Sequence, residues 1–364
     1  MPDELKNILK VASIYATTII GAGFASGQEI MQFFSAYKTG GFFGVLLAGI
    51  LFSAVGSIVL DKIYSQRIRN YEEFIIPMFG WRLGWIVKTI VTVFVFCMFC
   101  IMIAGSGNVI SQGFGLPIEY SALIMGFICL VLIMTSIKGI VLLSTIISPV
   151  LVTGIILSGL YIIFFNEYQV SGLYDLLSNV TDNWFLSSLL YVSYNSILAI
   201  VMMCGMLPYI KTRRTAIAGG IAGGMSLAAA ALVINVVVTL FYPAAVDKEL
   251  PVMYILKSFS NTAGSLYSVL LWLAMLTSAV ASGYSFAERT GSAFRIDKRI
   301  VAVILCGAAV PLSTLGFSRL IALIYPAFGY LGLFMIIVIL TSSLKKPFGF
   351  ARSGEQQSRR KADR

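Results

Sequence analysis

Long runs of apolar residues, separated by short polar segments, dominate the sequence and define its predicted elements. A helix needs about 20 residues to cross the roughly 30 Å hydrocarbon core of a bilayer. Ten runs reach about that length, at residues 9–35, 41–60, 86–113, 119–137, 139–165, 184–209, 215–241, 265–287, 299–317 and 320–342. Only Lys138 divides the fourth run from the fifth, and the ninth and tenth divide near Arg319. The pattern predicts an all-α polytopic membrane protein with about ten transmembrane helices.

Composition supports this class and removes several functions. The 364 residues are 58% hydrophobic and 12% charged, which is far from a soluble domain. Histidine is absent, which excludes histidine metal ligands, general bases and proton relays. There is no P-loop, no pair of acids at one depth and no serine–base constellation. We therefore expect neither an enzyme nor a nucleic-acid partner, and no organic cofactor.

The placement of basic residues predicts the topology, because cytoplasmic segments are enriched in Lys and Arg. With the N-terminus in the cytoplasm, 22 of the 26 Lys and Arg residues fall on the inner side. The outer segments hold only Lys38, Lys248, Lys257 and Arg319. This distribution predicts a multi-pass protein of the cell membrane with both termini in the cytoplasm.

Two longer connections suggest an internal repeat. Residues 69–82 follow the second run and residues 251–259 follow the seventh, and each resembles a short amphipathic interfacial helix. Each connection therefore follows the second run of a group of five. Because five is an odd number of spans, the second group would cross the membrane in the opposite orientation to the first. The predicted divisions are a first repeat at 1–165, an extracellular loop at 166–182, a second repeat at 183–342 and a basic, disordered cytoplasmic tail at 343–364.

The first run contains the motif IIGAGFASGQE at residues 19–29. Gly21, Gly23 and Gly27 each weaken a helix by roughly 1 kcal/mol relative to Ala. A bilayer tolerates broken backbone only where it is buried in protein or lines a cavity, and such breaks form midplane sites in many transporters. We predict a break near residues 21–26. The alternative is a helix–helix packing motif that uses small residues.

The sixth run carries a polar cluster, Tyr191-Val-Ser193-Tyr194-Asn195-Ser196, at mid-depth. The repeat predicts a second break there, near residues 193–197. The alternative is that these groups form hydrogen bonds across a bundle interface. Glu29 is a candidate functional acid, since intramembrane carboxylates are costly. It could neutralise a substrate amine, carry a coupling proton or be a structural partner of the polar groups in the sixth run.

The stretch GAGFASGQEIMQFF, the ten runs and the 5+5 pattern resemble the YkvI-like amino-acid permeases. That family belongs to the amino acid–polyamine–organocation superfamily, whose members share the LeuT fold. The resemblance covers nearly the whole chain except the tail. It implies a LeuT-like 5+5 inverted repeat with broken helices 1 and 6, and alternating access around a site between spans 1, 3, 6 and 8.

The resemblance also implies site residues. For the substrate they are Gly21, Ala22, Gly23, Phe24, Ser26 and Gln28 of the first run and Tyr194, Asn195 and Ser196 of the sixth. The eighth run has the A-x-x-T-S pattern of a sodium site, which implies Thr17, Ile20, Ala274, Thr277 and Ser278 as ligands. Against this, Thr and Ser in membrane helices often bond their own backbone.

The function expected from these features is secondary active transport of a small amino acid or related zwitterion, by a symporter coupled to sodium. The sodium ion, or a proton, would be the coupling ion. A proton-coupled permease that uses Glu29 is one alternative. A permease-like receptor or sensor that does not transport is another, because fold alone does not establish transport. The sequence does not predict an oligomeric state.

Overall fold

The computed structural model describes residues 3–135, 137–165, 183–313 and 317–344, and this part of the chain is helical without strands. The first half contains α1 (Asp3–Ile19), α2 (Ala22–Ser26), α3 (Gln28–Phe33), η1 (Ser35–Tyr37), α4 (Thr39–Gln66), α5 (Tyr71–Phe114), α6 (Ile118–Ile133) and α7 (Ile137–Phe164). The second half contains α9 (Trp184–Cys204), η2 (Leu207–Tyr209), α10 (Arg213–Leu240), α11 (Tyr242–Ala245), α12 (Pro251–Phe259), α13 (Asn261–Phe294), α14 (Lys298–Leu312) and α15 (Phe317–Leu344).

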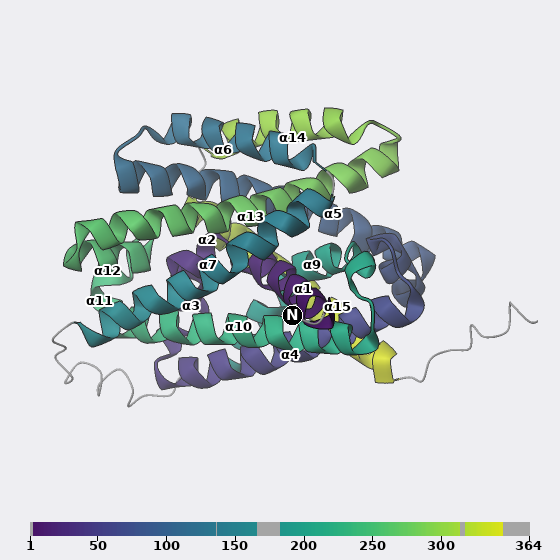
Figure 1. Cartoon of the computed structure of the whole chain (residues 1–364), viewed down its shortest axis with the longest axis horizontal. Coiled ribbons are helices and arrows are strands. Elements are labelled where there is room, and N and C mark those ends of the chain that lie inside the picture. The colour runs from purple at the N-terminus through teal and green to yellow at the C-terminus, as the bar shows by residue number, and fades with distance from the viewer. Residues whose placement is uncertain (1–2, 136, 166–182, 314–316, 345–364) are drawn as a thin grey trace, which may run out of the picture.

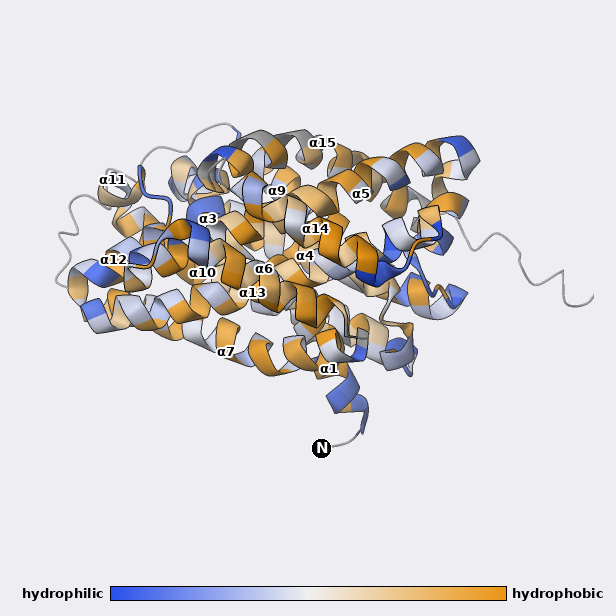
Figure 2. Ribbon diagram, turned by 90° about the horizontal axis from the view of Figure 1, so that it is seen from above, coloured by the Kyte–Doolittle hydropathy of each residue, from blue (hydrophilic) through white to orange (hydrophobic). Residues whose placement is uncertain are grey.

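In each of the ten apolar runs most of the described residues are helical, and six described helices are long and apolar enough to cross a membrane. These are α4, α5, α7, α9, α10 and α13. Helices α6 and α14 have 16 and 15 residues and lie side by side along one edge of the molecule (Figure 1). Hydrophobic residues predominate along the long helices, whereas hydrophilic ones gather near their ends (Figure 2). The predicted loop at 166–182 and the tail from residue 345 onward lie outside the described residues.

Two predicted turns are displaced from the charged residues that marked them. Helix α6 ends at Ile133 and α7 begins at Ile137, so Lys138 lies in the first turn of α7. Helix α15 begins at Phe317, so Arg319 also lies inside a helix, where its side chain is exposed. A long basic side chain can leave a helix end for water, and therefore it does not mark the turn itself.

The first run is interrupted twice. Helix α1 ends at Ile19, and α2 starts after Gly21, whose backbone is extended. The second interruption is Gly27, which adopts the left-handed conformation with φ of 85° and separates α2 from α3. Glycine adopts this conformation without the steric penalty of other residues. Residues 22–26 themselves form a short helix, so the breaks flank the predicted stretch instead of filling it.

The predicted break in the sixth run is wrong. Helix α9 continues through residues 193–197 without interruption. Its polar side chains donate to carbonyls one turn back along the same helix: Ser193 to Leu189, Asn195 to Tyr191 and Ser196 to Val192. These bonds satisfy the polar groups while the helix stays intact, and the segment has no glycine to favour a break.

Helices α4 and α10 pack closely because small residues face each other. A Cβ atom built on Gly220 would lie 2.4 Å from the backbone nitrogen of Ser57, and one built on Gly224 would lie 2.4 Å from that of Ser53. Such spacing of small residues lets membrane helices approach backbone to backbone. The pair spans the lower edge of the molecule in Figure 1.

The helix contacts repeat in the two halves of the chain. In chain order the ten segments are α1–α3, α4, α5, α6 and α7, then α9, α10, α13, α14 and α15. Equivalent helices contact each other: α1 with α9, α4 with α10, α5 with α13 and α6 with α14. Crossed contacts also occur in equivalent pairs, such as α1 with α10 and α9 with α4, or α1 with α7 and α9 with α15.

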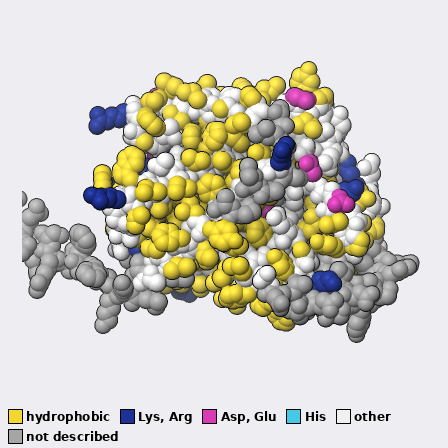
Figure 3. Space-filling view, turned by 180° about the vertical axis from the view of Figure 1, so that it is seen from behind, with side chains coloured by type: hydrophobic (Ala, Val, Ile, Leu, Met, Phe, Trp, Pro, Cys, Tyr) yellow, Lys and Arg dark blue, Asp and Glu magenta, His cyan; other side chains and the backbone are white. Residues whose placement is uncertain are grey.

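Segments predicted on the same side of the membrane meet one another. Arg213 forms an ion pair with Asp61, and Thr212 donates to Glu4. Toward the other end, the side chain of Lys257 donates to the carbonyl of Gln112. Hydrophobic side chains cover the middle of the face in Figure 3, and most of the charged ones in view lie toward its two ends.

Candidate functional site

The interruptions in the first run leave polar backbone groups at the centre of the bundle. At the end of α1 the Ala16 carbonyl accepts from the N–H of Ile20, and the Ile19 carbonyl accepts from that of Gly21. The remaining end carbonyls of α1 and the first N–H groups of α2 have no partner within their own helices. Residues 21–27 are all buried. Ser26 links the two short helices, since its hydroxyl donates to the carbonyl of Gly23 and accepts from the N–H of Gln28.

A cluster of oxygen atoms forms where α1 ends against α13. The Ser278 hydroxyl lies 3.2 Å from the carbonyl oxygen of Thr17 and 3.3 Å from that of Ile20. All three residues are buried. The close approach favours glycine, because a Cβ atom on Gly21 would lie 3.2 Å from the Ser278 hydroxyl and 3.2 Å from the methyl of Met102. The resemblance placed Thr17, Ile20 and Ser278 together, and the structure has them in contact.

The other two residues of this set are also on α13, where Thr277 directly precedes Ser278 and Ala274 lies one turn earlier. Thr277 is buried, and its hydroxyl donates to the carbonyl of Ala274 at 2.9 Å. The hydroxyl of Thr17 also bonds its own helix, at the carbonyl of Ser13. Ser278 is thus the member of the set whose hydroxyl reaches across to α1.

A second cluster forms around Glu29, in the first turn of α3. This side chain is only 2% exposed. The Tyr194 hydroxyl donates to its Oε2 at 2.6 Å. The carboxylate folds back over Gly23, where a built Cβ atom would lie 2.2 Å from Oε1. None of the described Lys or Arg side chains forms an ion pair with it.

Aromatic rings surround this carboxylate. The Tyr325 ring stacks on Tyr194 with centroids 4.5 Å apart and an interplanar angle of 24°. The Tyr191 ring meets Tyr194 edge-on at 5.7 Å, and Phe33 lies 5.6 Å from Tyr194. The site therefore combines one buried carboxyl group with several π faces, drawn from α3, α9 and α15.

Several other residues assigned from the resemblance do not join either cluster by a side-chain hydrogen bond. Phe24 is fully buried in the core, and Gln28 is partly exposed. Asn195 and Ser196 bond carbonyls of their own helix. Of the sixth-run residues assigned from the resemblance, Tyr194 is the one that bonds α3, at Glu29. Ser187, which was not assigned, also donates to α3, at the carbonyl of Phe33.

Sequence reasoning missed four residues. Tyr191 was named as part of the polar cluster but not as a site residue, whereas Tyr325, Met102 and Tyr267 gave no local signal. The Tyr267 hydroxyl donates to the carbonyl of Ala25 at 2.6 Å and so fixes the end of α2 to α13. A buried tyrosine in a membrane helix is the one pattern that could have pointed to Tyr325 and Tyr267, since its hydroxyl needs a partner.

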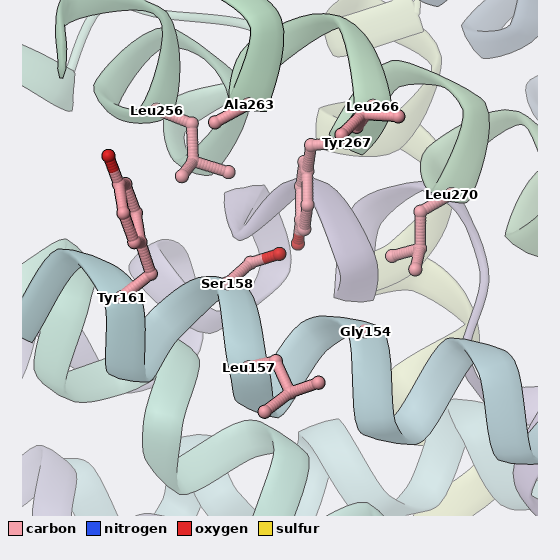
Figure 4. A pocket seen from close by; sticks show the side chains of 9 residues that line it. All are labelled: Gly154, Leu157, Ser158, Tyr161, Leu256, Ala263, Leu266, Tyr267 and Leu270. Atoms are coloured by element: carbon pink, nitrogen blue, oxygen red, sulfur yellow. The ribbon is translucent and has the colours of Figure 1, made fainter. Parts of the chain in front are cut away.

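A surface pocket lies close to Tyr267 but outside both clusters. It has a volume of about 320 Å³ and lies between α7, α12 and α13 (Figure 4). Its wall includes Leu157 and Leu266, whose side chains are 66% and 69% exposed. Because these exposed leucines lie on helices long enough to cross a membrane, the opening faces the surroundings of the bundle and not its centre.

Searches among known proteins give relatives of similar length. No family model matches the chain. The chain is 25% identical over 339 residues to the uncharacterized membrane protein YkvI of Bacillus subtilis, covering 91% of this chain and 94% of the relative. It is 26% identical over 323 residues to the uncharacterized protein YyaD of the same organism, covering 89% and 93%.

Solved structures share the fold. The structure of MhsT in complex with L-phenylalanine has a TM-score of 0.68 and 15% identity, over 91% of this chain and 87% of that one. A substrate-bound Na⁺-coupled sialic acid symporter has a TM-score of 0.66 and 14% identity, over 90% and 78%. Mhp1, a nucleobase-cation-symport-1 family transporter with bound bromovinylhydantoin, has a TM-score of 0.57 and 15% identity, over 90% and 77%. These neighbours are transporters of the LeuT fold, and the chain is a multi-pass membrane protein that shares it.

Proposed function

We propose that this protein is a sodium-coupled secondary transporter of a small amino acid or related zwitterion, working by alternating access. The oxygen cluster at Ser278 is the observation that carries the proposal. Ca²⁺, a hard cation close to Na⁺ in radius, binds oxygen ligands at about 2.3–2.6 Å, so two ligands at a right angle around such an ion are roughly 3.4 Å apart. The Ser278 hydroxyl is 3.2 and 3.3 Å from the two carbonyls, which suits a shared ion.

The proposed ion site uses the carbonyls of Thr17 and Ile20, the hydroxyls of Thr277 and Ser278, and the carbonyl of Ala274. Binding would replace the hydroxyl–carbonyl bonds with ion contacts. The Na⁺-coupled sialic acid symporter among the structural neighbours supports this assignment by analogy of fold. The proposed substrate site lies beside it, at residues 21–24, 26 and 28 of the first run and at Tyr194, Asn195 and Ser196 of α9.

The proposed architecture is ten spans in two inverted repeats, at 1–165 and 183–342, with both ends of the chain in the cytoplasm of a cell-membrane protein. The equivalent helix contacts in the two halves support it.

Uptake into proteoliposomes tests the proposal. Purified protein would be reconstituted and assayed with each of the twenty radiolabelled amino acids under an inward sodium gradient, a proton gradient or neither. We expect saturable uptake of at least one amino acid that collapses when potassium replaces sodium. Binding without uptake under any gradient would indicate a sensor, and uptake that follows the proton gradient alone would indicate coupling through Glu29.

A further inference from the structure

The cluster around Glu29 contains a buried polar atom that has no hydrogen-bond partner among the described residues. The hydroxyl of Tyr191 is fully buried and has no hydrogen-bond partner. The buried hydroxyl of Tyr325 lies within donating reach of the Glu29 carboxylate but accepts no hydrogen bond. Both tyrosines lie within electrostatic reach of the Glu29 carboxylate. Unpartnered buried polar groups are rare and need an explanation. One unpartnered hydroxyl and a second that accepts no hydrogen bond, both beside a buried acid, indicate that a donor ligand is missing.

The charge and shape of the cluster define that ligand. A buried carboxylate without a basic partner is costly unless a cation reaches it, and the tyrosine rings present π faces that attract cations. An alkylammonium group has three N–H donors and no acceptor. The Glu29 carboxylate and the hydroxyl oxygens of Tyr191 and Tyr325 offer three acceptors, whereas the Tyr194 hydroxyl is already engaged as a donor to Oε2.

A proton alone would satisfy this site less completely. Protonation would neutralise Glu29 but leave the Tyr191 hydroxyl without a partner. A metal cation is a poorer match as well, because the described residues contain no group of three or more His, Cys, Asp or Glu side chains around one point. The aromatic walls favour an organic cation over a hydrated one.

We propose that Glu29, Tyr191 and Tyr325 bind the primary ammonium group of the transported substrate. This inference rests on the proposed function and assigns its substrate class: compounds with a primary ammonium group, with the carboxylate dispensable. The Glu29 side chain lies over Gly23, next to the break in the first run, so the ammonium would bind where the helix is discontinuous. The left-handed Gly27 connects α3 to α2, and rotation there would open the cluster.

Matched ligand sets test the assignment on the full-length protein in nanodiscs. Each set holds an amino acid, the amine that lacks its carboxylate and the acid that lacks its ammonium: leucine, isopentylamine and 4-methylpentanoate, or phenylalanine, phenethylamine and 3-phenylpropionate. Equivalent sets are built on the amino acid that stabilises the protein most against heat. We expect the amino acid and the amine to bind and the acid to bind at least 10-fold more weakly. Equal binding of the acid would overturn the inference.

Substitutions test which residues of the cluster bind the ammonium group. Glu29→Gln keeps an oxygen that can accept from Tyr194 but removes the charge, and should weaken amine binding roughly 10- to 100-fold, as expected for hydrogen bonds to charged groups. Tyr191→Phe and Tyr325→Phe keep the rings and should each cost roughly 3- to 10-fold. Tyr15→Phe is the control, because this buried hydroxyl donates to the backbone carbonyl of Phe52 and to no member of the cluster. It should leave amine affinity unchanged.

The outcomes separate this inference from the proposed function. Amine binding that depends on Glu29, without uptake in proteoliposomes, would support the ammonium site and refute transport. Uptake with unchanged ammonium preference in Glu29→Gln would support transport and refute the ammonium site. Loss of proton dependence in that variant, with amine affinity intact, would make Glu29 a proton carrier instead. Absence of binding by all amino acids and amines would contradict both proposals.

Discussion

Removing the hydroxyl of Ser278 is the sharpest test of the ion site. This hydroxyl is the contact from α13 to the α1 carbonyls of Thr17 and Ile20, at 3.2 and 3.3 Å. Ser278→Ala deletes one ligand of the proposed sodium ion without adding bulk. Interactions of a polar group with a charge contribute about 1.5–3 kcal/mol, so sodium affinity should fall by about 10- to 150-fold.

The same substitution has a second effect without sodium. The two carbonyls are buried and would lose their hydroxyl partner, which costs about 1–3 kcal/mol. Melting temperature in potassium should therefore fall by a few degrees. In the unaltered protein sodium should raise the melting temperature, and in the variant this rise should require a far higher sodium concentration. The two effects can be separated because the first lowers the melting temperature measured without sodium. The second raises the sodium concentration at which the stabilisation by sodium is half-complete.

Ser282→Ala is the matched control. Ser282 is one turn further along α13, is fully buried, and donates only to the carbonyls of Ser278 and Ala279 in its own helix. Melting curves of the protein and both variants would be recorded against sodium at constant ionic strength, with potassium as the replacement. An unchanged sodium half-saturation in Ser278→Ala, or an equal shift in Ser282→Ala, would refute the reasoning.

Three further substitutions test the surroundings of the site. Gly23→Leu should displace the Glu29 carboxylate, since even a Cβ would lie 2.2 Å from its Oε1; we expect a lower melting temperature and loss of amino-acid binding in a thermal-shift assay. Tyr267→Phe removes the 2.6 Å hydrogen bond to the Ala25 carbonyl and should lower the free energy of unfolding by about 1 kcal/mol. It should also slow uptake in proteoliposomes, and wild-type uptake rates would disprove a role of Tyr267 in holding α2. Gly224→Leu should separate α10 from α4 and reduce the yield of monodisperse protein on size exclusion, because the backbones touch there.

The parts of the fold that follow from local chemistry could be predicted from the sequence. Apolar runs of sufficient length gave the helices, and Gly21 and Gly27 marked the interruptions in the first of them. The break expected in α9 failed because it was transferred from the first repeat, although that segment lacks glycine. There Ser193 and Ser196 bond their own helix, which keeps it continuous. A repeat constrains which helices pair but not whether each stays intact.

The contacts within the site could not be predicted in the same way. Glu29 lies over Gly23 only because Gly27 turns the chain with φ of 85°, and the pattern of apolar residues does not encode that direction. Tyr325 joins the cluster from α15 through tertiary packing on Tyr194. By contrast, the contact of Ser278 with Thr17 and Ile20 was expected from the resemblance, because the A-x-x-T-S pattern carried a specific geometry with it.

The two clusters are joined by a very short piece of backbone, and this has a thermodynamic consequence. Ile20 supplies a carbonyl to the oxygen cluster, and Gly23 lies under the Glu29 carboxylate. An ion held by the carbonyls of α1 would restrict the orientation of α2, on which the carboxylate rests. Substrate binding at Glu29 would restrict the same segment from the other side. Linkage requires that sodium raise substrate affinity by the same factor by which substrate raises sodium affinity. Titrating each ligand at saturating and zero concentrations of the other measures both factors, and a factor of one in either direction would mean that the break in the first run does not couple the two sites.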